Sequence, residues 1–460
     1  MKLKEWVNAT FSKNGLLIGA VFLVVGFSWS WLFTSRVAEL ADSMMAGYLL
    51  ALLGFVVIVS LTSYVFIKII LYFQRTYFMG KRISFWVLPL LFVVWSAVEY
   101  LVSLFSTLVW FGRNGSVDSV LPFASFTPTL SHTPLGYLSR FVGFHGLSAV
   151  IVVLIAVCVV KKLRKYALVT FASVIIATFI SWACYKIPTG NPVNVLIVAE
   201  SLSETVKTPE GNYELAVFPE YGLSNFSNGA ERILPNKQHD VFYVGSKQAP
   251  ADKGHKNVLV YGSSNRGVLE QRAKSRLIPG GEYLPYIPST LLHATNAHKT
   301  LDYFELFKAV EKGPTNYSVL EVNDEVRLGS AVCASIISPE DYRRFTKNGA
   351  TVLTNSASLG IFNSKLFTFQ HQGLAKFMAT ANARPFLQSA NDADAFALDH
   401  NGNMIARTSP VSTKEVTVTT NSTTTPYTVL GEWPVYIGLI AMATILFKKV
   451  YRRKRLLKTK

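Results

Sequence analysis

The sequence predicts a membrane α-helical bundle of about six spans joined to a separate α/β domain. Three observations predict this fold class. Half of the 460 residues are hydrophobic, 13% are aromatic and the mean hydropathy is positive, which is too apolar for one ordinary soluble domain. The apolar residues gather in runs long enough to cross a bilayer. The long stretch between the last two runs, by contrast, is charge-balanced and rich in predicted strands.

The apolar runs define the membrane part, because crossing a bilayer as a helix takes roughly 20 apolar residues. Six runs qualify, at about 15–34, 48–72, 84–111, 142–160, 166–184 and 433–448. The first run is too long for a signal peptide and lacks a small-residue cleavage site, so we expect it to stay as an anchor. We therefore predict five spans within 1–186, an α/β domain at 187–430, and a last span with a basic tail at 431–460.

The net charge of +17 indicates topology, because it lies outside the α/β domain. Residues 191–430 contain 22 basic and 22 acidic side chains, so the whole excess belongs to the remainder. It is concentrated in four clusters: Lys2, Lys4 and Lys13; Arg75, Lys81 and Arg82; residues 161–165; and the tail 448–460. If these clusters face the cytoplasm, the six spans alternate correctly and the α/β domain lies outside the cytoplasm. A neutral domain also argues against nucleic acid as a partner.

The α/β domain is predicted from short β-branched or aromatic runs that end at Gly, Ser, Asn or Pro. Eleven such runs stand at 193–200, 214–220, 240–246, 257–263, 317–323, 326–334, 350–356, 386–391, 394–399, 404–409 and 415–420. Two helices are expected among them. Residues 338–349 open with a Ser-Pro-Glu start signal and end at Asn-Gly, and residues 366–384 carry one apolar stripe.

Three reactive side chains stand where strands are expected to end: Glu220, Lys274 and Cys333. A free thiol near pKa 8.5 is only a few per cent thiolate at neutral pH, so a Cys nucleophile needs a neighbouring base or cation. Glu220 can accept the Cys333 proton, and Lys274 can stabilise the thiolate and the oxyanion formed by attack on a carbonyl. The amide of Ala334 is a second candidate donor. Singly, each residue also fits a structural role: a strand end, an exposed basic face or a core cysteine.

Ordered sequence blocks around these residues resemble the nitrilase, or carbon-nitrogen hydrolase, superfamily. Phe-Pro-Glu ending at Glu220 is similar to its glutamate motif, and Lys-Ser-Arg-Leu-Ile-Pro-Gly-Gly-Glu from Lys274 to Glu282 is similar to its lysine block. The flanking spans resemble the membrane branch of that superfamily, the apolipoprotein N-acyltransferases. Further blocks match the same branch: Trp95-x-x-x-Glu99, Gln370-His371, Ala383-Arg384-Pro385, Asn391 and Glu432-Trp433-Pro434.

The resemblance implies a nitrilase-like αββα sandwich on the extracytoplasmic side of the cytoplasmic (inner) membrane of a bacterium. It implies a Glu220–Lys274–Cys333 triad, with Glu282 orienting Lys274 or the incoming amine. The implied partners are the membrane, a phospholipid acyl donor and a lipoprotein acceptor, whose diacylglyceryl-cysteine amine receives the acyl chain from a Cys thioester. We expect no cofactor and no metal, because the eight His residues show no metal-ligand spacing.

The chain departs from the family pattern in two places. The family follows its nucleophile with Tyr-Glu, whereas this chain has Ala334-Ser335. Where the family has Asn-Asp-Ala-Trp-Phe, this chain has Asn-Ser-Ala-Ser-Leu at 355–359. Two alternatives therefore stay open. One is a membrane-tethered amidase or other C-N hydrolase that uses water as the acceptor. The other is a catalytically silent scaffold.

Overall fold

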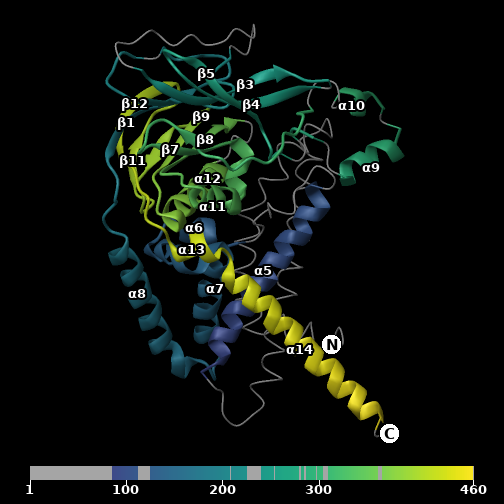
Figure 1. Ribbon diagram of the computed structural model, residues 1–460. Helices are drawn as coiled ribbons and strands as arrows, with labels where there is room; N and C mark the ends of the chain where they lie inside the picture. Colours follow the sequence, from purple (N-terminus) through teal and green to yellow (C-terminus); the bar gives the residue numbers. More distant parts are fainter. Residues whose placement is uncertain are drawn as a thin grey trace.

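The computed structural model describes residues 85–111, 125–207, 209–224, 240–252, 254–278, 281–283, 286–296, 298–303, 309–360 and 365–458. The predicted spans at about 15–34 and 48–72 lie outside these residues. The described part consists of a group of long helices and a strand-rich domain at one end of them (Figure 1).

Four long helices make up the described membrane part: α5 (Val87–Phe111), α7 (Ser139–Val159), α8 (Ala167–Cys184) and α14 (Trp433–Lys458). Among the described residues, three segments are long and apolar enough to cross a membrane: Val87–Leu104, Pro134–Val159 and Arg164–Cys184. They coincide with the third, fourth and fifth predicted spans. The apolar part of α14, Trp433–Lys448, is shorter. The total of six spans stays a prediction.

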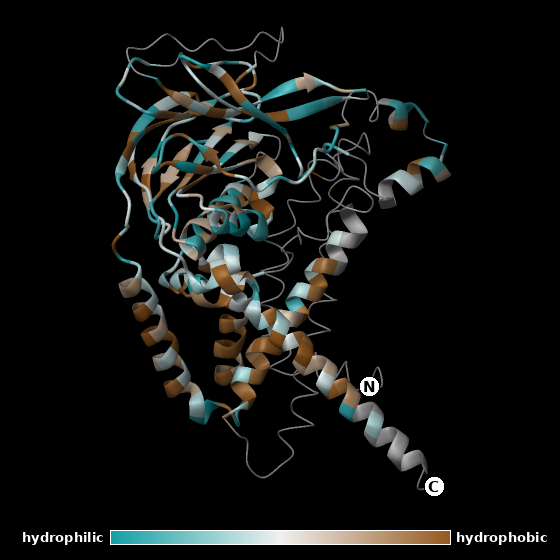
Figure 2. Cartoon of the chain, in the orientation of Figure 1, coloured by the Kyte–Doolittle hydropathy of each residue, from teal (hydrophilic) through white to brown (hydrophobic). Residues whose placement is uncertain are grey.

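Helix α8 presents apolar side chains to its surroundings. Leu168 is 81% exposed, and Ile175 and Phe179 are also mostly exposed. Figure 2 shows the same hydrophobic colouring along α5, α7 and α14, whereas the strand-rich domain is mixed. Because a soluble surface rarely carries so large an apolar patch, this helix has the surface expected of a lipid-facing segment.

The strand-rich domain contains a twelve-stranded sheet whose main path runs β5-β4-β3-β2-β1-β9-β8-β7-β6. The strands are β1 (Pro192–Glu200), β2 (Leu215–Val217), β3 (Phe242–Pro250), β4 (His255–Ser263), β5 (Gly267–Ala273), β6 (Leu320–Glu321), β7 (Arg327–Val332), β8 (Val352–Ser358), β9 (Phe386–Asn391), β10 (Phe396–Leu398), β11 (Met404–Arg407) and β12 (Ser412–Thr419). All of the predicted strands are present. The prediction missed β5, an edge strand whose residues are mostly exposed.

The sheet curls at β1. This strand pairs with β12 over almost its whole length, from Pro192↔Thr419 to Ala199↔Ser412, and only its last two residues pair with β9, at Ala199↔Ala390 and Glu200↔Asn391. The two halves of the sheet therefore face each other. Apolar side chains from both halves fill the space between them: Val195, Ile197, Leu215, Val244, Leu328, Val332 and Leu387.

The helices α11 (Pro339–Lys347) and α12 (Lys365–Asn382) cover the outer face of β7, β8 and β9 (Figure 1). They bury a second cluster that includes Tyr342, Phe345, Phe377, Leu353 and Phe386. On the opposite outer face, the buried cluster within the described residues is made of strand and loop side chains, with none from a helix. The described part thus shows three of the four layers of the predicted αββα sandwich.

Polar contacts join the long helices to each other and to the domain. Gly143, with φ of 71°, interrupts α7, and the freed amides of Phe144 and His145 donate to the Glu432 carboxylate at 2.6 and 3.1 Å. Glu432 directly precedes α14, so the two helices are fixed to each other where they meet the domain. The fully buried Arg140 of α7 donates to the carbonyls of Thr380 and His400.

Candidate active site

The three predicted reactive residues each follow a strand of the curled sheet, as the sequence predicts. Glu220 comes three residues after β2, Lys274 directly after β5, and Cys333 directly after β7. Because β2 and β7 belong to facing halves of the sheet, residues far apart in sequence meet at one end of the sandwich. All three are buried, with exposed fractions of 3% for Glu220, 3% for Lys274 and 6% for Cys333.

Lys274 lies between two carboxylates. Its Nζ donates to Glu220 Oε1 at 2.9 Å and to Glu282 Oε1 at 2.6 Å. The second oxygen of Glu282 accepts from the Ile278 amide at 2.7 Å, which fixes the carboxylate in place. Glu282 thus contacts Lys274, one of the two groups that it is predicted to orient.

Glu220 is held by three further contacts. The side-chain amide of Asn257 donates to Glu220 Oε1 at 2.6 Å, and the Glu220 amide donates to the Ala357 carbonyl at 3.3 Å. The side-chain amide of Asn391 donates to the Glu220 carbonyl. The backbone carbonyl of Asn257 also accepts a hydrogen bond from the backbone amide of Lys274 at 2.7 Å. Asn257 therefore contacts both members of the ion pair.

Cys333 stands at a sharp strand-to-helix turn. It follows β7 and opens the 3-10 helix Cys333–Ile337, with φ of 44°, a conformation that L residues rarely adopt. The Ser358 amide, at the end of β8, hydrogen-bonds the thiol. Ala334 lies in the first turn of the 3-10 helix, where backbone amides have no acceptor within the helix. This location is consistent with the predicted role of the Ala334 amide as a donor.

The electrostatics set the resting protonation states. Burial raises the pKa of the Cys333 thiol above its usual range, and Glu220 raises it further, against the opposing effect of Lys274. Burial alone would lower the pKa of Lys274, but Glu220 and Glu282 outweigh it and hold that pKa well above its usual value. At neutral pH the thiol is thus protonated and the lysine charged. Attack by Cys333 on a carbonyl would then require proton transfer to a base, which is the role predicted for Glu220.

The arrangement brings a buried thiol, carboxylate and ammonium into one cluster, and acyl transfer can use these three groups as nucleophile, base and fixed cation. Within the described residues, no group of three or more His, Cys, Asp or Glu side chains is arranged to hold a metal ion. His371 of α12 makes no hydrogen bond through either ring nitrogen among the described residues. Burial lowers the pKa of His371 to about 4, which leaves the ring neutral.

Three other predicted positions have structural contacts. Trp95 Nε1 donates to Glu99 Oε2 at 3.2 Å on α5, and Glu99 also pairs with His145 of α7. The buried Arg384 donates to the carbonyls of Ala350 and Thr423 at 2.6 Å each. These contacts hold helices and loops together outside the reactive cluster.

Sequence comparison extends the resemblance beyond single blocks. No family model matches the chain. In an alignment 485 positions long, the chain is 22% identical to the apolipoprotein N-acyltransferase of Pasteurella multocida. The alignment covers 96% of this chain and 88% of that protein. The chain is thus similar, at low identity, to proteins named apolipoprotein N-acyltransferase. The predicted resemblance is therefore confirmed.

Two other relatives with the same name match over shorter ranges. The enzyme of Photobacterium profundum is 24% identical over 204 residues, covering 43% of this chain and 38% of that protein. The enzyme of Thermotoga maritima is 24% identical over 274 residues, covering 59% and 50%. The chain thus spans half or less of the length of these two relatives.

Among solved structures, the chain aligns with Saccharomyces cerevisiae Nit3, a member of branch 10 of the nitrilase superfamily. That alignment has 11% identity and a TM-score of 0.35, and it covers 50% of this chain and 90% of Nit3. An amidase from Nesterenkonia sp. aligns at 13% identity with a TM-score of 0.33, covering 51% and 92%.

Proposed function

We propose that the protein is a membrane acyltransferase. It would move a fatty acyl chain from a phospholipid, through a thioester on Cys333, to the N-terminal amine of a diacylglyceryl-cysteine lipoprotein. The observation that carries the proposal is the buried Glu220–Lys274–Glu282 cluster beside the thiol of Cys333. The distant relationship to proteins named apolipoprotein N-acyltransferase supports the choice of substrates.

In the first half-reaction, Cys333 Sγ attacks the ester carbonyl of the phospholipid while Glu220 takes the thiol proton. The Lys274 ammonium and the Ala334 amide stabilise the oxyanion of the tetrahedral intermediate. As the intermediate collapses, the carbon–oxygen ester bond breaks and Glu220 returns the proton to the leaving alkoxide. A lysophospholipid departs, and the acyl group remains on Cys333 as a thioester.

In the second half-reaction, the neutral amine of the acceptor attacks the thioester carbonyl. Glu220 takes a proton from the attacking nitrogen, and Lys274 again stabilises the oxyanion. Breaking the carbon–sulfur bond releases Cys333 as a thiolate, which recovers its proton from Glu220. The product is an amide, and the enzyme returns to its resting state with the thiol protonated and Lys274 charged.

The arrangement of the helices supports an extracytoplasmic site in the cytoplasmic membrane of a bacterium. The α/β domain joins α8 and α14 at one end of the helices (Figure 1). The basic segment 161–165 and the basic C-terminal tail lie at the other end, and basic residues favour the cytoplasmic side. Two lipid substrates confined to a bilayer need a site at its surface, and a domain at the membrane boundary supplies one.

The experiment that tests the function gives the full-length protein a phospholipid and an N-terminal diacylglyceryl-cysteine peptide in detergent micelles. Mass spectrometry of the peptide should show one added fatty acyl group and no free fatty acid beyond the background. Fatty acid released without acylated peptide would identify water as the acceptor and favour the hydrolase alternative. No reaction at all would favour the catalytically silent scaffold. The 2.9 Å contact of Lys274 with Glu220 favours the enzyme, because a scaffold does not require it.

A further inference from the structure

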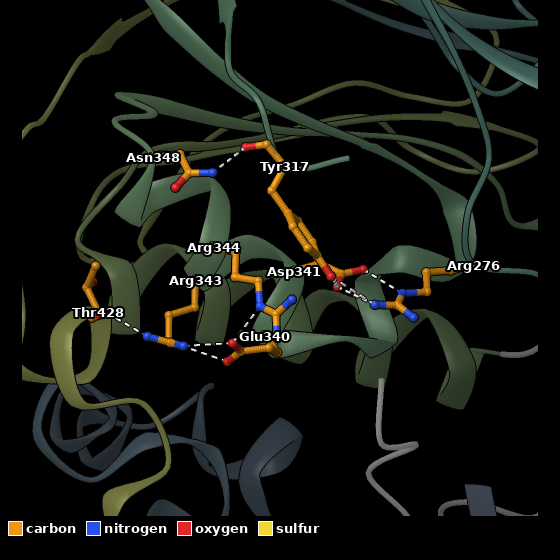
Figure 3. A network of polar contacts seen from close by, with 8 residues as sticks. All are labelled: Arg276, Tyr317, Glu340, Asp341, Arg343, Arg344, Asn348 and Thr428. Atoms are coloured by element: carbon orange, nitrogen blue, oxygen red, sulfur yellow. Dashed lines mark hydrogen bonds and ion pairs between the residues drawn. The ribbon is translucent and has the colours of Figure 1, made fainter. Parts of the chain in front are cut away.

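A second buried ion pair lies next to the reactive cluster. Arg276, two residues after Lys274, donates to Asp341 through two nitrogens, Nε to Oδ2 at 2.8 Å and Nη2 to Oδ1 at 2.7 Å (Figure 3). The Tyr317 hydroxyl donates to Asp341 Oδ1 at 3.0 Å and lies 3.2 Å from Arg276 Nη2. Arg276 and Asp341 are each 3% exposed. The pair is therefore closed off from water and fixed in a two-point geometry.

The two partners belong to the two sides of the proposed site. Arg276 lies on the segment after β5 that carries Lys274. Asp341 lies in the first turn of α11, which follows the 3-10 helix opened by Cys333, and its amide donates to the Ser338 carbonyl at 3.1 Å. The ion pair thus connects the lysine segment directly to the cysteine segment.

We infer that the Arg276–Asp341 ion pair is a positioning device that holds Lys274 at the thiol of Cys333. The inference rests on the proposed function, because it assigns the pair a role in that reaction. Buried ion pairs contribute little net stability compared with apolar residues of similar size, so stability alone does not account for this one. A planar guanidinium bound through two nitrogens fixes orientation as well as distance, which a single-point contact does not.

The same helix offers a contrasting pair. Glu340 accepts from Arg344 at 2.9 Å and from Arg343 at 2.7 Å, and Arg343 also donates to the Thr428 carbonyl of α13 (Pro426–Leu430). Figure 3 shows these contacts directed away from Arg276. Arg343 binds Glu340 through two nitrogens, Nε to Oε2 and Nη2 to Oε1, at 2.7 Å each. Arg343→Lys therefore keeps the charge and removes a two-point contact on α11 without touching the lysine segment.

The test compares Arg276→Lys with Arg343→Lys in the full-length protein. In each variant lysine keeps the charge but loses the second contact to the carboxylate, of Asp341 in the first and of Glu340 in the second. Misplacing a reacting group by about 1 Å costs roughly 100-fold in rate. Arg276→Lys should therefore lower the first-order rate of Cys333 acylation about 10- to 100-fold, and Arg343→Lys should leave it unchanged. Equal rates in the two variants would overturn the inference.

A second readout does not depend on acyl transfer. The titratable groups that act on the thiol, among the described residues, are Glu220, Lys274, Glu282, Tyr221 and Tyr342. If Arg276 holds Lys274 in place, Arg276→Lys should shift the pH dependence of Cys333 alkylation by iodoacetamide to higher pH, because the stabilising cation moves away. An unchanged profile would overturn the inference. A wild-type protein that forms no acyl adduct would refute the proposed function, while the alkylation profile would still decide the positioning role.

A double variant covers the case in which Arg276→Lys unfolds. Arg276→Met with Asp341→Leu replaces both charges by apolar side chains, so no buried charge is left alone. Its thermal midpoint should stay close to that of the wild type, and its alkylation profile should shift as in Arg276→Lys. A double variant that is stable and has wild-type alkylation and acylation would show that the pair serves only to hold the fold.

Discussion

Replacing Lys274 with Met removes the cation that Glu220 and Glu282 share. Lys274 Nζ lies 2.9 and 2.6 Å from the two carboxylates, and its side chain is 1% exposed. Removing one partner of a buried ion pair costs about 3–5 kcal/mol, because a carboxylate is left buried without a cation. For a domain of this size about 1 kcal/mol corresponds to roughly 2–4 °C, so the thermal midpoint should fall by about 6–20 °C.

The loss should depend on pH, and its sign follows from Glu282. Burial already raises the pKa of Glu282 with Lys274 present, and removal of the cation raises it further. A carboxyl whose pKa is higher in the folded state stabilises the fold fully below its unfolded pKa, near 4.3, and loses that contribution as the pH rises through the folded value. The deficit of Lys274→Met should therefore be largest at neutral pH and shrink toward pH 5.

The assay is thermal unfolding in detergent micelles, followed by tryptophan fluorescence between pH 5 and pH 8. Lys256→Met is the control, because Lys256 pairs with Glu311 at 3.0 Å with both side chains more than a third exposed. Exposed pairs contribute about 0–1 kcal/mol, so this control should unfold near the wild-type temperature. A Lys274→Met protein as stable as the control, or with a deficit constant across this pH range, would refute the account of the ion cluster.

Three further outcomes are expected. Glu220→Gln should lower the rate of Cys333 acylation about 100- to 10,000-fold, the usual contribution of a general base, as measured by stopped incubation and mass spectrometry. Asn257→Ala removes the 2.6 Å contact to Glu220 and should cost about 1–3 kcal/mol of stability, measured by thermal unfolding; no change would exclude a positioning role. In a Cys158→Ser/Cys184→Ser background, alkylation of Cys333 should keep rising above pH 9, because burial raises the thiol pKa; a plateau below pH 8 would contradict this.

The reactive residues could be predicted from the sequence because each one follows a recognisable pattern. Glu220 and Cys333 come after apolar β-branched runs, and parallel strands bring their carboxyl ends to one edge of a sheet. Lys274 was recognised because the segment from Lys274 to Glu282 resembles the lysine block of the nitrilase superfamily, and not because the strand before it could be predicted. Strand β5 has only two consecutive large apolar residues, Val268 and Leu269, followed by Glu-Gln-Arg at an exposed sheet edge, so it lacks the apolar run that marks a buried strand.

The supporting contacts could not be predicted, because they join residues that no local pattern relates. Asn257 is the third residue of β4, and nothing in that strand's sequence indicates that its side chain reaches Glu220, 37 residues earlier. Arg276 and Asp341 are 65 residues apart and meet only because the sheet curls. The φ of 44° at Cys333 likewise follows from the strand-to-helix turn, which the sequence Cys-Ala-Ser does not reveal.

The most direct test of the central claim is the intact mass of the full-length protein after incubation with phospholipid and without an acceptor. The account predicts an increase by one fatty acyl group, located on Cys333 by peptide mapping, removed by hydroxylamine and absent from a folded Cys333→Ala variant. An unmodified wild-type protein, or an acyl group that persists in Cys333→Ala, would contradict the assignment of Cys333 as the nucleophile.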